Sequence, residues 1–144
     1  MPYDARDLES LDEYRTCVAH IDSLIKETNA DDIILGGDLN ADHFNRSRFW
    51  LELEILMNKL NLYHCTNVFS PDNFTYLCPS NSSTSFLDHI FCSSRLKDSI
   101  KNINILYKFS LFGHFPVQFE FDFNCSEIRC FVYCRNQITI FRLE

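Results

Sequence analysis

A strict alternation of apolar and polar residues near the end of the chain restricts the fold more than any other feature of the sequence. Val117, Phe119, Phe121 and Phe123 alternate with Gln118, Glu120 and Asp122. Successive side chains of a strand point to opposite faces, so this pattern puts the apolar side chains together on one face. Segment 115–123 is therefore predicted to be a strand with one buried face and one face in water.

Two amphipathic helices are predicted in the first half of the chain, one on each side of a short buried strand at 33–35. The first helix is expected to begin with a capping box at Ser10 and to end at Asn29. Its apolar face holds Leu11, Tyr14, Val18, Ile21, Leu24 and Ile25. The second helix is expected at about 47–61, with an apolar stripe of Phe49, Leu53, Leu56, Met57 and Leu60. We interpret both faces as core packing.

The remaining segments are predicted to form strands at 74–77, 86–92 and 103–109, with a short helical turn from Ser94 through Ile100. Helices and strands together indicate an α+β fold, and 144 residues fit one domain or a piece of one. Residues 124–144 have no clear partner in this scheme. A linker, an extra strand and a frayed tail all remain open for them.

The composition favours a folded protein: apolar residues make up 46% of the chain and charged residues 23%. The net charge is -7, from 13 Lys+Arg against 20 Asp+Glu. This balance disfavours a protein that grips nucleic acid by charge alone. Acidic side chains suit a site for divalent cations, although soluble surfaces are commonly acidic as well.

The N-terminal residues carry mixed charge with no apolar segment behind them, and no run approaches the roughly 20 apolar residues of a membrane helix. We therefore expect a cytoplasmic or nuclear protein that is not secreted and has no membrane partner. Its seven Cys are expected to be reduced thiols. A zinc-binding domain is a weaker alternative, because Cys125, Cys130 and Cys134 are loosely spaced and form no CxxC pair.

Polar residues follow the predicted strand at 33–35. Gly36 and Gly37 permit a tight turn, which would present Asp38 and Asn40 together. A carboxylate there can orient or deprotonate a water, and an amide can donate to a phosphate oxygen. An ordinary Asp/Asn turn is the alternative interpretation.

A second candidate pair lies further along the chain. Asp88 falls in an otherwise apolar strand, where a carboxylate needs a partner. His114 could be that partner: Asp88 would fix its tautomer and leave the other ring nitrogen for a phosphate. Taken singly, His114 could also be a plain loop histidine. His89 points to the opposite face from Asp88 and is predicted to be structural.

Together these segments resemble the endonuclease/exonuclease/phosphatase superfamily, which includes abasic-site endonucleases, DNase-I-like nucleases, inositol phosphatases and the endonuclease domains of non-LTR retrotransposons. The family pattern is Gly-Asp-x-Asn, then Ser-x-x-Asp, then Ser-Asp-His-x-Pro-Val. The chain has Gly37-Asp38-Leu39-Asn40, Ser85-Phe86-Leu87-Asp88 and Phe112-Gly113-His114-Phe115-Pro116-Val117. Met1-Pro2-Tyr3-Asp4 and Phe74-Thr75-Tyr76 resemble the retrotransposon members in particular.

The resemblance implies a two-layer β-sandwich flanked by helices, of which residues 1–123 would form the C-terminal portion and residues 124–144 a tail. It also implies hydrolysis of phosphodiesters or phosphomonoesters with Mg²⁺. Asp38 would activate the attacking water and is a candidate metal ligand, Asn40 would hold the water and the phosphate, His114 would stabilise developing charge, and Asp88 would orient His114. The implied partners are DNA, the N-terminal half of the domain and a reverse transcriptase in a longer polyprotein.

The chain also departs from the family pattern. Gly113 stands where the family has an Asp that helps the metal site, and Phe112 replaces the usual Ser. The segments with the family's Asn and Glu metal ligands and its phosphate-contacting Tyr are not in this sequence. We therefore expect a DNA-nicking endonuclease by ancestry that is inactive or impaired in this chain. A catalytically dead interaction module on the same fold and a phosphatase of the same superfamily are the alternatives.

Overall fold

The computed structural model describes residues 8–28 and 30–122, together with the backbone of 128–133 and 138–143. The opening Met1-Pro2-Tyr3-Asp4, Phe123 and the side chains of the three candidate zinc cysteines lie outside the described residues. In the described part of the chain, no helix is long and apolar enough to cross a membrane.

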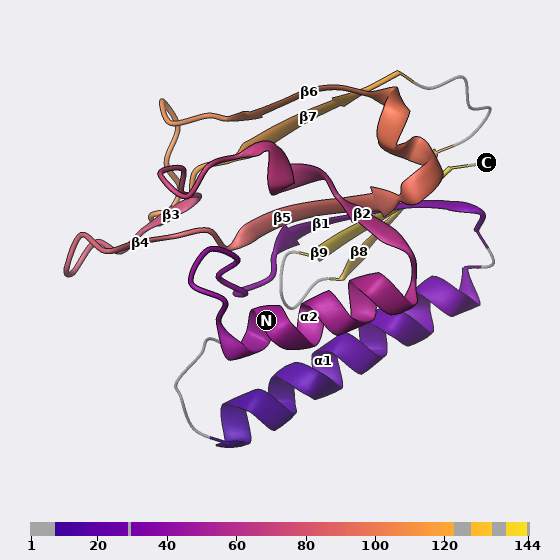
Figure 1. The fold of residues 1–144 in the computed structure, drawn as a ribbon, viewed down its shortest axis with the longest axis horizontal. Coiled ribbons are helices and arrows are strands. Elements are labelled where there is room, and N and C mark those ends of the chain that lie inside the picture. The colour runs from indigo at the N-terminus through magenta and orange to yellow at the C-terminus, as the bar shows by residue number, and fades with distance from the viewer. Residues whose placement is uncertain (1–7, 29, 123–127, 134–137, 144) are drawn as a thin grey trace.

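Two helices, α1 (Leu8–Glu27) and α2 (Arg48–Lys59), lie side by side on one face of the main sheet (Figure 1). The second begins as predicted, because the Oγ of Ser47 accepts the backbone N–H of Trp50 at 3.2 Å. The predicted capping box was wrong. Helix α1 already includes Leu8, and Ser10 is buried within it, since Glu9 in the first turn favours a helix start further upstream.

The main sheet has five strands in the order β2-β5-β1-β9-β8, and all neighbours are antiparallel. They are β1 (Asp32–Asp38), β2 (Leu62–His64), β5 (Asp88–Ser93), β8 (Ile128–Tyr133) and β9 (Ile138–Leu143). Of the three alternatives for residues 124–144, the extra strand therefore matches 128–133 and 138–143. These two segments extend the sheet on the side of β1.

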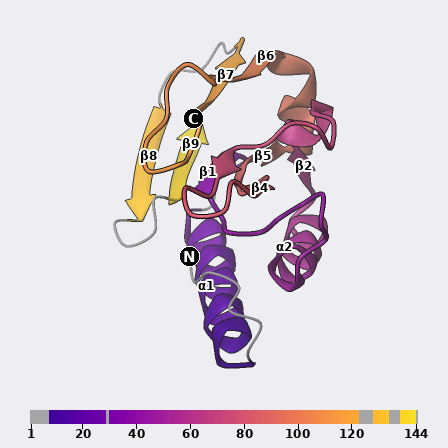
Figure 2. The same cartoon turned by 90° about the vertical axis from the view of Figure 1, so that its left-hand side faces the viewer.

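A second, two-stranded sheet pairs β6 (Ile100–Ile105) with β7 (Val117–Phe121). It lies on the face of the main sheet opposite the helices (Figure 2). The predicted alternation is confirmed in β7, whose apolar side chains are half-buried while Gln118 and Glu120 are exposed. Shorter elements are η1 (Cys65–Val68), β3 (Tyr76–Leu77), β4 (Thr84–Ser85) and η2 (Ser94–Ser99).

Each interface between layers has its own apolar core. Tyr14, Leu35, Phe49, Leu53 and Phe91 are among the buried side chains between the helices and the main sheet. Ile34, Ile90, Cys92 and Leu96 pack on the other side against the β6–β7 pair. The prediction of an α+β sandwich of two sheets flanked by helices is confirmed, and the ends of β1 and β5 are fixed between both cores.

A chain of buried polar groups lies beneath the turn that follows β1. His89 is 1% exposed, and its Nε2–H donates to the carbonyl of Ala41 at 2.7 Å. The Nδ1 of His89 must then accept a hydrogen bond, and the Nε2–H of His64 lies 3.1 Å from it. The same Nε2 of His64 lies 2.6 Å from the Oγ1 of Thr66. His89 is therefore structural, as predicted. Burial lowers the pKa of His89 to about 4 and that of His64 to about 2.

Acid should destabilise this fold through these histidines. Their pKa values are lower in the folded chain than in the unfolded one, so the unfolded state binds more protons between about pH 6.5 and pH 4. His89 alone should cost roughly 2 kcal/mol of unfolding free energy between pH 7 and pH 5. Urea denaturation at the two pH values measures this loss. His89→Gln should be less stable at pH 7 but should lose less on acidification; an equal loss would contradict this explanation.

Candidate active site

The register between β1 and β5 places two carboxylates opposite each other at the same end of the sheet. Asp38 is the last residue of β1, Asp88 is the first of β5, and the two are direct partners in the antiparallel pair. Their side chains are only about one-fifth exposed. Like charges in this position repel each other, so a cationic or hydrogen-bonding group between them is stabilising.

The tight turn predicted at Gly36 and Gly37 was wrong, because both glycines lie within β1. The loop that follows Asp38 and carries Asn40 is held from three directions. The buried hydroxyl of Tyr14 in α1 donates to the carbonyl of Leu39 at 3.1 Å, and the N–H of Leu39 donates to Leu87 at 3.0 Å. The Oδ1 of Asp38 accepts the backbone N–H of Asn40 at 3.0 Å, and Asn40 has φ of 50°. The loop is therefore positioned by α1, by the approach to β5 and by its own carboxylate.

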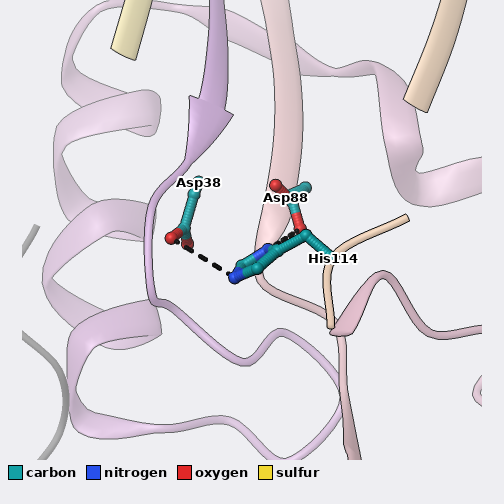
Figure 3. Close-up of side chains that lie close together, drawn as sticks. All are labelled: Asp38, Asp88 and His114. Atoms are coloured by element: carbon teal, nitrogen blue, oxygen red, sulfur yellow. Dashed lines mark hydrogen bonds and ion pairs between the residues drawn. The ribbon is translucent and has the colours of Figure 1, made fainter. Parts of the chain in front are cut away.

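His114 lies between the two carboxylates (Figure 3). Its Nδ1–H donates to the Oδ2 of Asp88 at 3.0 Å, and its Nε2 faces the Oδ2 of Asp38 at 3.9 Å. The second distance is longer than a hydrogen bond. Asp88 thus fixes the orientation of the ring, and Nε2 is directed at the space beside Asp38, where a phosphate oxygen could be met.

The electrostatics of the site favour a protonated ring beside an unusually basic carboxylate. The hydrogen bond to Asp88 raises the pKa of His114. Loss of solvation, followed by repulsion from Asp88, raises the pKa of Asp38. A group with a raised pKa is a better proton acceptor at neutral pH, which is what the activation of a water requires.

Thr75 is a functional residue that the sequence reasoning missed. It is fully buried, and its Oγ1 accepts the backbone N–H groups of Leu87 and Asp88, both at 2.9 Å. Its carbonyl accepts the N–H of Phe115, the residue after His114, at 2.7 Å. Thr75 therefore holds the Asp88 segment and the His114 segment together. The sequence predicts a strand at 74–77 and a resemblance of Phe74-Thr75-Tyr76 to retrotransposon members, but neither prediction identifies these contacts of Thr75.

A tight turn, Leu111 to His114, carries the histidine into the site. The two end residues exchange backbone hydrogen bonds of 2.9 Å each, and the two central residues, Phe112 and Gly113, have φ of 51° and 89°. A Cβ on Gly113 would lie 2.6 Å from the carbonyl oxygen of Leu77. The backbone therefore has no room for the Asp of the family pattern in this conformation.

The residues present suit a divalent cation. Asp38, Asp88 and His114 each offer one donor atom, and these atoms lie within 4.8 Å of one another. Asp88 already engages His114, so Asp38 is the residue best placed to hold an ion. A cation would relieve the desolvation and repulsion that raise the pKa of Asp38, and Mg²⁺ needs only one or two carboxylates besides waters and substrate oxygens. When bound, it would neutralise charge on a phosphate.

The sandwich and the Asp/His site together indicate the class of proteins that hydrolyse phosphoesters. A family model described as endonuclease/exonuclease/phosphatase family matches residues 5–101, and the chain belongs to that family. The family indicates phosphodiester hydrolysis in general and is typically metal-dependent. Asp38, Asn40 and Asp88 lie within the matched residues. His114 lies beyond them, and the fold brings it to Asp88. A comparison with curated proteins gives no match.

Proposed function

We propose that this chain is part of a Mg²⁺-dependent, DNA-nicking endonuclease of the non-LTR retrotransposon type, with impaired activity of its own. One observation carries the proposal: His114 is held by Asp88 on one ring nitrogen and directs the other toward Asp38. This is the arrangement that in-line hydrolysis of a phosphodiester needs, with a carboxylate for the water and a donor for the phosphate.

Each residue has a defined task in this proposal. Asp38 orients a water and takes its proton as the water oxygen bonds to phosphorus and the ester oxygen leaves. Asn40 holds the water and the phosphate. The Nε2–H of His114 donates to a phosphate oxygen as negative charge builds up there, and the carboxylate of Asp88 stabilises the ring in its protonated form.

Two features support the finer parts of the proposal. The Phe74-Thr75-Tyr76 segment favours the retrotransposon type, and Thr75 ties together the segments that carry the site. Gly113 supports impaired activity, because a glycine has no side-chain oxygen to offer a cation. The segments that supply the family's other ligands, carried on the N-terminal half of the domain in a longer polyprotein, are the proposed partner that completes the site.

Nicking of supercoiled plasmid with Mg²⁺ tests the proposal. Asp38→Ala and His114→Ala should each lower the rate by about 10²–10³-fold, because each removes a group that acts in the transition state. Chelation of the metal should also abolish nicking. The matched controls are Asp72→Ala, which removes a carboxylate from an exposed loop, and His20→Ala, which removes an exposed histidine of α1. Controls that lose as much activity as the site variants would contradict the assignment.

A catalytically dead interaction module is the second candidate, and Gly113 is the observation that favours it. Folded wild-type protein that leaves the plasmid intact would support this candidate and refute hydrolysis by the chain alone. A phosphatase of the same family is favoured by the net charge of -7. Release of inorganic phosphate from a phosphomonoester, lost in Asp38→Ala, together with an intact plasmid would identify it.

A further inference from the structure

The tip of the turn beside the site carries an aromatic ring in solvent. Phe112 is 88% exposed and is two residues from His114 in the sequence. We propose that Phe112 is a specificity-determining residue that stacks on a nucleobase of the strand whose phosphate meets His114. This inference deepens the proposed function and rests on it, since it names the substrate class of the same site.

The turn holds Phe112 in a fixed place relative to the site. Its ends, Leu111 and His114, are joined by two backbone hydrogen bonds, and the carbonyl of Gly113 accepts the N–H of Leu77 at 2.9 Å. Beneath it, the ring of Tyr76 lies 4.7 Å from that of His114, centroid to centroid. Phe112 therefore cannot move far without moving the histidine.

A phenylalanine is a costly choice for this position. Its φ of 51° is a left-handed conformation that bulky side chains rarely adopt, and Gly or Asn would suit such a turn better. The ring is almost fully in water, so it adds little to either core. Strain together with an exposed ring beside a candidate active site indicates a contact with something outside the chain.

The surroundings indicate that this contact is with nucleic acid. From Ser99 to Phe119 the sequence contains no Asp or Glu, although the chain has 20 of them. Of the two lysines in this run, Lys101 is paired with Asp122 at 3.1 Å, and Lys108 is exposed next to Phe109. A polyanion can therefore approach along it. Phe109 and Leu111, 64% and 63% exposed, add to the apolar tip. Phe and Leu side chains typically insert between bases or stack on them. Such stacking does not depend on the nucleotide sequence, because every base has an aromatic face.

Distance supports the same partner. Phe112 and His114 are two residues apart in one tight turn, so their Cα atoms lie within roughly 7 Å of each other. A phosphate at the Nε2 of His114 therefore brings an adjacent base within reach of the Phe112 ring. A lipid surface is the other partner that an apolar tip would bind. However, the absence of carboxylates from residues 99–119 would not strengthen binding to an uncharged membrane.

Binding measured without hydrolysis tests the inference. The probes are a fluorescein-labelled single-stranded DNA of about 20 nucleotides and an oligomer of equal length built from abasic tetrahydrofuran residues, both at low salt with EDTA. Phe112→Ala should weaken binding of the DNA about 10-fold by fluorescence anisotropy and leave binding of the abasic oligomer unchanged. Phe112→Trp should bind the DNA at least as well as wild type.

Two further variants keep the test independent of folding. Phe112→Gly should show the same loss of binding with an equal or higher melting temperature, because glycine is at ease at this φ. Ile55→Ala, which removes an apolar side chain that is 65% exposed on α2, should not change binding.

Several results would overturn the inference. One is that wild-type protein does not bind the DNA, and another is that Phe112→Ala weakens binding of both oligomers equally. A third is that Phe112→Ala leaves binding of DNA unchanged but loses binding to phosphatidylcholine vesicles, which would assign the tip to a lipid surface. Binding of DNA that depends on Phe112, from protein that never nicks plasmid, would refute the proposed hydrolysis and leave the stacking role standing.

Discussion

Thr75→Val should remove a large part of the stability of this fold and disorganise the site. The substitution keeps the shape of the side chain but deletes the Oγ1 that accepts two backbone N–H groups, those of Leu87 and Asp88. Each buried donor left without an acceptor costs roughly 1–3 kcal/mol, so the total is about 2–6 kcal/mol. Urea denaturation monitored by circular dichroism measures this loss.

A second measurement distinguishes a role of Thr75 in positioning Asp88 from a role in stability alone. If Thr75 places Asp88, its loss should let the raised pKa of His114 return toward the ordinary value, which the proton NMR titration of the ring reports. Thr75→Ser retains the hydroxyl and should preserve both the titration of His114 and most of the stability. A valine variant with an unchanged His114 titration would show that Thr75 supports the fold without aligning the site.

Gly113→Asp is the other substitution with a large expected effect, and its direction is contrary to what the family pattern suggests. Restoring the Asp should not rescue activity. Its Cβ would lie 2.6 Å from the Leu77 carbonyl oxygen and 3.0 Å from the ring of Tyr76, at a φ of 89°. Left-handed strain and overpacking together should cost roughly 2–5 kcal/mol and displace His114.

Gly36→Ala is the matched control for this prediction. A Cβ there would meet only ordinary contacts of 3.7 Å, with the carbonyl oxygen of His89 and with Ile90. We expect it to change the melting temperature little, whereas Gly113→Asp should lower it strongly and slow nicking. A Gly113→Asp protein as stable as wild type and faster in nicking would show that the turn can adopt the backbone of the family pattern.

Local patterns in the sequence predicted the local parts of the structure. The apolar stripe and Ser47 located α2, and the period of two located β7, because each depends on neighbours within a few residues. The pairing of Asp88 with His114 was foreseen from the cost of an isolated carboxylate. The capping box at Ser10 failed because a favourable first turn upstream competes with it.

The contacts that hold the site could not be predicted in this way. Thr75 joins a segment 12 residues away to one 40 residues away, and neither contact leaves a periodic trace in the sequence. The role of His89 beneath Ala41 likewise depends on a contact across 48 residues. Residue types indicate which chemistry is available, but only the folded structure shows which backbone groups a hydroxyl or an imidazole hydrogen-bonds.

The opposition of Asp38 and Asp88 across β1 and β5 has a consequence for how this site can change. Their separation is inherited from the spacing of adjacent strands, roughly 4.5–5.5 Å between opposed Cα atoms. Loop substitutions cannot adjust it gradually, and a sheet alters such a pairing only by slipping whole residues, which turns apolar side chains outward. The spacing of the two carboxylates is therefore fixed by the strand register, and variation in substrate choice must come from the turns around them.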